Sequence, residues 1–222
     1  SMLTLTNEDS SAGYAVGGFG FSGERAHTME SVFKYSFKTQ QFENAGILPE
    51  PRSQAGAVAW GGDLWLFGGW DHDPKRGKDE SDRYFTKIRR LHDNDGKVEA
   101  VDCNIEIPRI RRAFGGAMLG DSYYMVGGLG ETFEAVDVCD VFNFTTKTFS
   151  TIPSPSVPRI NPQWCALNHK LYLFGGTQLG AGDGGSPVFS VEEYDPKANS
   201  WRVVCETVPN TTKDTRMLAS SD

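Results

Sequence analysis

The chain has 222 residues, enough for one large domain or two small ones, and 38% of them are hydrophobic. This composition excludes a disordered chain, and no run of about 20 apolar residues is available to span a membrane. The formal net charge of −7 argues against a nucleic-acid-binding domain, because such a domain presents a basic face. We therefore expect neither nucleic acid nor a membrane as a partner.

Four cysteines are present, and no two of them have the spacing of a zinc site. They are Cys103, Cys139, Cys165 and Cys205, and the last three fall inside apolar, strand-like runs. We predict buried free thiols, which suit a reducing compartment. Because the start at Ser1 shows no leader-like region, the sequence predicts a cytoplasmic protein, and no cofactor or metal is expected.

Pairs of glycines follow four apolar runs along the chain. The pairs end at Gly18, Gly69, Gly128 and Gly176, between 48 and 59 residues apart. An internal period of this length is typical of propeller blades or solenoid repeats. The high glycine content, 25 residues, thus arises in part from one structural position that recurs in each repeat.

Two further landmarks recur with the glycine pairs. An aromatic residue is followed seven positions later by another in three of the repeats: Tyr35 and Phe42, Phe142 and Phe149, Tyr194 and Trp201. In the second repeat Leu91 and Val98 hold these positions. Arg52, Arg111 and Arg159 each precede the first glycine of a pair by 16 residues.

Each repeat is expected to contain four short strands, because apolar residues recur over short runs and no helical period occurs. Leu3–Thr6 is the expected first strand of the first repeat, and the small residues of 55–59 form that of the second. The third repeat predicts strands over 115–119, 123–126, 138–143 and 148–151. Small side chains in the first strands would let the sheets approach one another at a common axis.

The order of strand, glycine pair, loop, spaced aromatic pair, arginine and small-residue strand resembles the kelch repeat over residues 3–205. The resemblance implies an all-β fold, a kelch-type β-propeller with four four-stranded blades visible. Sheets with two apolar faces must stack to bury them. The implied blades cover residues 3–48, 52–106, 111–152 and 159–205, and 206–222 is the start of a further blade or a tail.

Kelch propellers most often close with six blades, so four blades imply part of a larger, six-bladed propeller. Residues 216–221 read as the first strand of another blade. A self-closing ring of four blades and completion by a second chain are the alternatives. An incomplete propeller exposes strand edges and an apolar face, which predicts self-association.

Two motifs suggest other chemistry and are better explained as loops. Residues 18–23 fit GxGxxG, but no helix is expected after them to hold a dinucleotide. The charged stretch after Trp70 holds Asp71, His72 and Asp73, which with His27 could ligate a metal. Alternating charge on a long loop is more typical of a solvated surface.

The recurring arginines are the main candidate for binding. In a propeller, the start of each first strand and the loop after each second strand lie on the same face. This places six residues around one mouth of the channel: Arg52, Ser53, Arg111, Arg112, Arg159 and Asn161. Arginines and serines at this place read acidic peptides in the kelch adaptors that the chain resembles, and guanidinium groups bind carboxylates with two parallel bonds. In the alternative, these arginines bind blade-edge carbonyls or neighbouring acids.

Trp70, just after the second glycine pair, is a candidate contact at the rim of the same face. Its alternative is packing under its own loop. Trp164, in a strand that is otherwise built of small residues, is expected to fill the axis.

These features predict a non-enzymatic scaffold that binds a protein or acidic peptide at its loop face, and a substrate adaptor is the finer form of this prediction. The first alternative is a sugar-processing enzyme of the sialic-acid mutarotase type, with Glu24, Glu131 and Asp71 as the acids to test. The second alternative is a cytoskeletal binding module.

Overall fold

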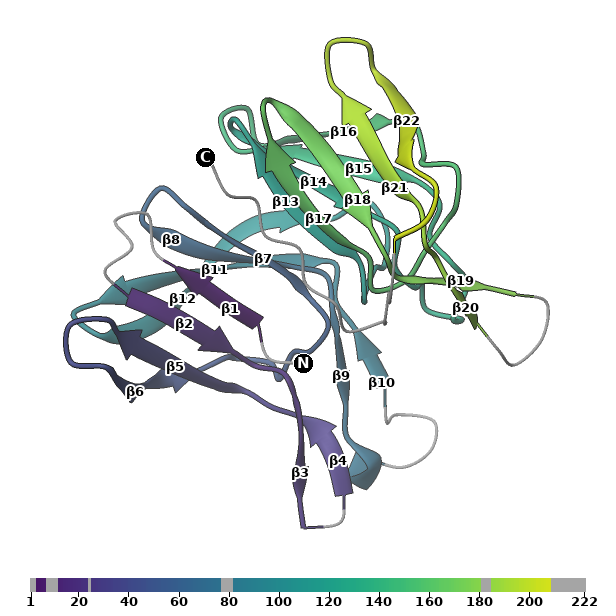
Figure 1. The fold of residues 1–222 in the computed structure, drawn as a ribbon. Helices are drawn as coiled ribbons and strands as arrows, with labels where there is room; N and C mark the ends of the chain where they lie inside the picture. Colours follow the sequence, from purple (N-terminus) through teal and green to yellow (C-terminus); the bar gives the residue numbers. More distant parts are fainter. Residues whose placement is uncertain (1–2, 7–11, 24, 77–81, 181–184, 209–222) are drawn as a thin grey trace. The chain divides into compact units, whose positions relative to one another are not determined.

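The computed structural model describes residues 3–6, 12–23, 25–76, 82–180 and 185–208. The chain divides into two compact units, Ser1–Arg112 and Ala113–Asp222. Each unit contains two four-stranded antiparallel sheets, which we call blades 1 and 2 in unit 1 and blades 3 and 4 in unit 2 (Figure 1). The predicted strand at 216–221 lies outside the described residues.

Unit 1 holds the first two blades and two short ribbons. Blade 1 has the order β1 (Leu3–Thr6), β2 (Ala12–Val16), β5 (Ser31–Ser36), β6 (Gln41–Ile47). Blade 2 has the order β7 (Gly56–Trp60), β8 (Asp63–Phe67), β11 (Lys87–Asn94), β12 (Lys97–Glu106). In both blades, a ribbon replaces the loop between the second and third strands: β3 (Phe19–Ser22) with β4 (Arg25–Thr28), and β9 (Trp70–His72) with β10 (Asp82–Tyr84). The 3-10 turn η1 (Pro74–Arg76) follows β9.

Unit 2 repeats the same plan. Blade 3 has the order β13 (Gly115–Leu119), β14 (Ser122–Val126), β15 (Cys139–Asn143), β16 (Thr148–Ile152). Blade 4 has the order β17 (Gln163–Leu167), β18 (Lys170–Phe174), β21 (Val191–Asp195), β22 (Ser200–Cys205). A ribbon of β19 (Thr177–Leu179) and β20 (Gly185–Pro187) extends from blade 4. The all-β fold, the strand at Leu3–Thr6 and the four strands predicted in the third repeat are confirmed, with ends shifted by one residue at most.

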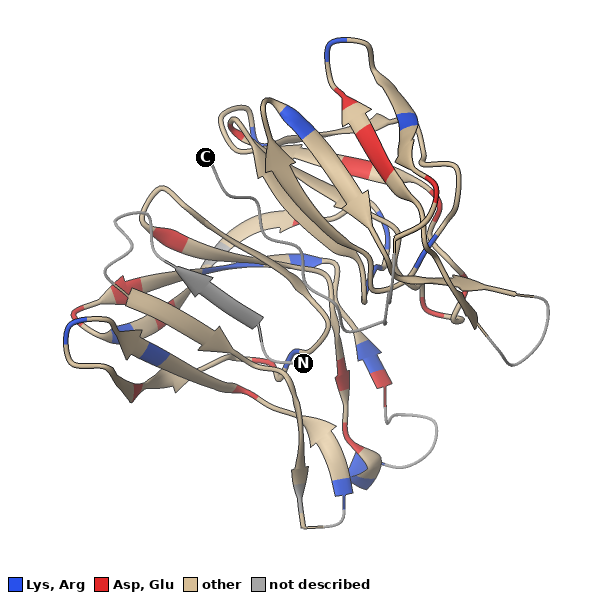
Figure 2. Ribbon diagram, viewed as in Figure 1, with Lys and Arg blue, Asp and Glu red and all other residues tan. Residues whose placement is uncertain are grey.

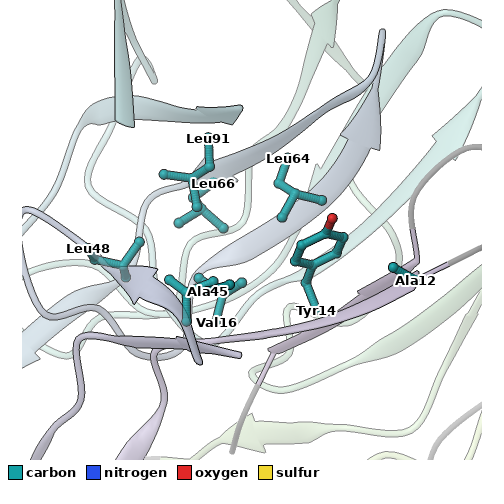
Figure 3. Close-up of a cluster of buried hydrophobic side chains, with 9 residues drawn as sticks. Ala12, Tyr14, Val16, Ala45, Leu48, Leu64, Leu66 and Leu91 are labelled. Atoms are coloured by element: carbon teal, nitrogen blue, oxygen red, sulfur yellow. The ribbon is translucent and has the colours of Figure 1, made fainter. Parts of the chain in front are cut away.

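The core of unit 1 lies between blades 1 and 2. Period-2 alternation places Tyr14 and Val16 of β2 on the same face, opposite Leu64 and Leu66 of β8 (Figure 3). Leu91, which takes the position of the first aromatic residue of the other repeats, is 1% exposed in this core. The degenerate second copy of the aromatic pair thus keeps its packing role with aliphatic side chains.

The core of unit 2 is more aromatic. Tyr194 and Trp201 lie on paired strands with their ring centroids 5.2 Å apart, and Trp201 stacks on Trp164 at 6.2 Å. Trp201 Nε1 donates to the Pro153 carbonyl of the preceding blade. Ring packing and this hydrogen bond together join blades 3 and 4, as the spaced aromatic pair predicts. Trp164 is 8% exposed and belongs to this core.

The glycine pairs occur where one blade contacts the start of the next. The N–H groups of Gly18 and Gly128 donate to the carbonyls of Arg52 and Arg159 over 2.9 and 3.0 Å. The preceding glycine, Gly127 in the second case, has φ of +65° and would carry a Cβ in steric overlap with the same carbonyl. Only glycine satisfies both the left-handed backbone and the close approach.

The GxGxxG segment forms β3 and the turn into β4, and no helix follows it in the described residues. The segment is thus part of a β-ribbon and not the loop that the sequence predicted. No helix long and apolar enough to cross a membrane was found among the residues described.

Candidate functional site

The arginines at the blade starts are buried in their own blades. Arg52 is 1% exposed, and its Nη1 donates to the carbonyls of Gly68 and Lys87, both at 3.2 Å. Arg159 is 0% exposed, and its Nη1 donates to the carbonyls of Gly175 and Ser190 at 3.2 and 3.3 Å. These are the carbonyl bonds that the sequence left open as the alternative to ligand binding.

A carboxylate accompanies each of these two guanidinium groups. Glu192, itself buried, accepts from Arg159 Nη2. In blade 2 the position of Glu192 is taken by Arg89, so the carboxylate comes from Glu50 instead. Glu50 pairs with Arg89 and lies 3.9 Å from Arg52. Burial lowers the pKa of Arg52 to about 10, and burial likewise lowers the pKa of Arg159 while Glu192 opposes the shift.

The remaining predicted residues of unit 1 surround Trp70. Ser53 is buried and exchanges backbone hydrogen bonds with Trp70 at 2.9 and 3.0 Å. Arg112 is also buried, stacks over the Trp70 ring at 4.5 Å and donates to Gln54 over 2.6 Å. Burial lowers the pKa of Arg112. Arg111 is 1% exposed, and its carbonyl accepts from Gly69 N–H.

In unit 2, Asn161 has a left-handed φ of +50° and donates its N–H to the Ala113 carbonyl over 2.7 Å. It therefore shapes the chain just after Arg159. The structure brings Ser53, Trp70 and Arg112 together within unit 1, and Arg159 with Asn161 within unit 2.

The accessible part of the unit 1 loop face is aromatic. Phe19 and Phe21 share one face of β3, and Trp70 and His72 share one face of β9. Phe19 lies 6.1 Å from Trp70 and 6.0 Å from His72 between ring centroids. Phe19 and Phe21 are 39% and 74% exposed. We call these four side chains the aromatic platform.

A hydrogen bond joins the two ribbons that carry the platform, and an ion pair lies within the second of them. His72 N–H donates to Thr28 Oγ1 of β4 over 2.8 Å. The buried Asp71 accepts from Arg76 on η1, and this hydrogen bond raises the pKa of Arg76. The ribbons therefore form one connected surface (Figure 1).

A pocket of about 410 Å³ opens between these ribbons. Its lining includes the apolar side chains Met29, Ile47 and Pro51. Arg25 of β4 and Lys75 of η1 are both exposed and line it. Figure 2 shows Lys and Arg in blue on both of these elements. Glu30 and Asp73 also line the pocket, so its charge is mixed.

The metal site and the catalytic acids considered from the sequence are not assembled in the described residues. No three His, Cys, Asp or Glu side chains are grouped so as to hold a metal ion in the described parts of the chain. His72 pairs instead with Asp82 at 2.8 Å. Of the three acids considered for catalysis, Asp71 is bound by Arg76, Glu131 is exposed and Glu24 lies outside the described residues.

Sequence reasoning identified Trp70 but missed Phe19 and Phe21 as members of the surface. The available signal was the alternation of Phe19, Gly20 and Phe21 directly after a glycine pair. Two aromatic residues two positions apart on a strand outside the core share one exposed face. The GxGxxG match drew attention to the glycines instead.

Comparisons with known proteins agree with this architecture. Residues 158–204 match the Kelch motif family. Kelch repeat and BTB domain-containing protein 13 of Homo sapiens is 33% identical over 93 residues, which are 41% of this chain and 19% of that protein. N-(sulfonatooxy)prop-2-enimidothioate sulfolyase of Thlaspi arvense is 34% identical over 76 residues, 32% of this chain and 22% of that protein.

A solved structure, "Structure of YjhT", matches 93% of this chain and 70% of its own with a TM-score of 0.78 at 14% identity. This similarity supports the fold. The chain spans about a fifth of the length of these two curated relatives. Residues 158–204 thus carry a kelch motif, and the repeated glycine pairs and blade-to-blade hydrogen bonds make the rest of the chain similar to kelch-repeat β-propellers.

Proposed function

We propose that this chain is a protein-recognition segment of a kelch propeller, and that the loop face of unit 1 contacts the partner. The observation that carries the proposal is the aromatic platform. Exposed aromatic rings that are held by stacking offer a large contact area at little entropic cost, and aromatic residues dominate binding hot spots. Kelch-repeat relatives such as the human BTB-domain protein fit an interaction role.

The partner segment is proposed to be acidic. Arg25 and Lys75 are exposed and line the pocket, whose lining includes none of the four platform side chains. Arg76 is already paired with Asp71. The buried arginines Arg52, Arg112 and Arg159 would have to break their present hydrogen bonds to reach a partner. We therefore assign carboxylate recognition to Arg25 and Lys75, with Trp70 as the contact retained from the sequence prediction.

An adaptor role in a reducing, cytoplasmic setting is the finer form of this proposal. All four cysteines are free thiols, as expected for a protein that does not depend on disulfides. The prediction that they are buried holds for Cys139 and is wrong for Cys103, Cys165 and Cys205, which are partly exposed. The adaptor role requires domains outside this chain, since the chain itself supplies only the recognition surface.

The test is a selection of random peptides displayed on phage against the immobilised chain, followed by calorimetric titration of the selected peptides. We expect acidic peptides that also contain an apolar residue. Phe21→Ser should weaken their binding by about tenfold, equivalent to about 1.4 kcal/mol. Phe42→Ser is the matched control, because Phe42 is an exposed phenylalanine of β6 in the same unit.

Charge reversal tests the acidic specificity. Lys75→Glu should weaken binding of the selected peptides, and added salt should weaken binding to the unaltered chain. Equal effects of Phe21→Ser and Phe42→Ser would contradict the proposed surface. Calorimetric binding of small carboxylated sugars, with no peptide selected, would favour the enzyme alternative instead.

A further inference from the structure

We infer that Arg52 and Arg159 are positioning residues. Each holds together the two ends of the loop between the second and third strands of its blade, and we call this pair of ends the neck of the loop. The loop of blade 2 leaves β8 at Gly68 and re-enters the sheet at Lys87, the first residue of β11. Arg52 Nη1 donates to the carbonyls of both these residues. One nitrogen atom thus ties together the two ends of the loop that carries Trp70 and His72.

Blade 4 has the same arrangement with a different loop. Arg159 Nη1 donates to the carbonyls of Gly175, just after β18, and Ser190, just before β21. Counted from the first aromatic position of each repeat, Lys87 and Ser190 occupy equivalent places, four residues before Leu91 and Tyr194. The hydrogen bonds recur although the loop sequences differ, so they belong to the neck and not to a particular loop.

Further contacts fix each guanidinium at the neck. The Arg52 guanidinium lies over the Phe85 ring at 4.3 Å, and Phe85 N–H donates to the Gly69 carbonyl across the neck. Arg159 also donates through Nε to the Val157 carbonyl and through Nη2 to Glu192. A buried cation held by several acceptors has little freedom to move, so the loop ends share its fixed position.

The consequence for recognition rests on the proposed function. Strand β9 begins at Trp70, immediately beyond the neck, and the Trp70 ring contributes to the aromatic platform. If the neck opens, β9 and β10 lose the fixed separation at their base. A partner that requires the preformed platform would then have to pay for reordering the ribbon on binding.

The experiment compares Arg52→Met and Arg52→Lys by amide hydrogen exchange. Methionine keeps an apolar side chain but removes the N–H groups that donate to the two carbonyls. The lysine ammonium retains N–H donors for them. We expect Arg52→Met to speed exchange in residues 70–76 and 82–86 by about tenfold, with β7 and β8 unchanged, and Arg52→Lys to restore part of the protection. Arg90→Met is the control, since Arg90 belongs to the same blade but pairs with Asp63 on its surface.

Unchanged exchange in the ribbon, or an equal increase throughout blade 2, would overturn the neck assignment. If Arg52→Met does not fold, NMR of the unaltered chain labelled with ¹⁵N-arginine decides the matter. Slowly exchanging Arg52 Nη protons support the assignment, and exchange as fast as that of Arg90 overturns it. Neither measurement needs a partner, so both stand apart from the peptide selection.

A peptide from that selection then tests the link to recognition. Arg52→Met should weaken its binding by about tenfold, and Arg52→Lys should restore most of the affinity. Loss of protection in the ribbon with unchanged affinity would leave the neck role intact and refute its effect on binding.

Discussion

At the scale of single residues, glycines with similar positive φ angles serve different purposes. Gly120 and Gly127 have φ of +62° and +65°. A Cβ at Gly120 would have no neighbour within 4 Å among the described atoms, whereas a Cβ at Gly127 would overlap the Arg159 carbonyl. Gly120 therefore serves a hairpin turn, and Gly127 serves the contact between two blades.

This pair gives a matched test of the glycine repeat. Gly120→Ala should cost roughly 1–2 kcal/mol, which is the usual penalty for a left-handed non-glycine residue. Gly127→Ala should cost at least about 3 kcal/mol, because overlap with the Arg159 carbonyl adds to the same backbone strain. Urea unfolding of both variants measures the difference. Equal losses would show that the blade contact tolerates a methyl group.

A second residue-scale prediction concerns Glu193. Hydrogen bonds from Arg202, Lys170 and Tyr172 lower its pKa to about 2. A carboxyl group whose folded pKa is depressed stabilises the fold above its ordinary pKa and loses that contribution as the pH falls through the folded value. Glu193→Gln should therefore be less stable than the unaltered chain at neutral pH, and the difference should shrink between about pH 4.5 and 2. Thermal unfolding across this range is the measurement, and a constant difference would contradict the assignment.

At the scale of elements, the sequence predicts blades better than it predicts surfaces. Alternation, glycine pairs and aromatic spacing are local signals, and they located strands such as 115–119 correctly. The orientation of Arg52 is not a local property, because its acceptors, Gly68 and Lys87, lie 16 and 35 residues away. An arginine at a fixed position therefore predicted a cation near the loop face, but not that its charge points into the blade.

The contact between blades 3 and 4 supplies the element-scale prediction. Trp201 of β22 contributes both ring packing against Trp164 and a hydrogen bond to the Pro153 carbonyl. Trp201→Phe removes the hydrogen bond and should cost about 1 kcal/mol. Trp201→Ala removes the ring as well and should cost about 3 kcal/mol. Chemical denaturation compares the two, and a midpoint within error of the parent for the alanine variant would refute the packing role.

At the scale of the whole molecule, the two faces of blade 4 differ. Leu171, Leu173 and Tyr194 alternate onto the face that packs against blade 3. Tyr172, Phe174 and Val191 lie on the opposite face of the same sheet and are partly exposed. In blade 3, the corresponding face contributes Ala117 and Val126 to the core with blade 4. The outer face of blade 4 therefore presents these apolar side chains beside the ion pairs of Glu193 with Lys170 and Arg202.

We predict that this face makes the chain self-associate when no further blade covers it. Partly exposed aromatic and aliphatic side chains on a sheet face favour association, and mutual burial is the driving force. Phe174→Glu places a charge on this face and should shift the chain toward monomer, whereas Phe133→Glu, in the exposed loop between β14 and β15, should not. Light scattering over a concentration series measures both variants. A parent chain that stays monomeric at every concentration would contradict the prediction and favour a ring closed by four blades, in which this face is already buried. A longer chain that includes the following repeat should remain monomeric, because the next blade would cover Phe174 in the way that blade 4 covers Val126.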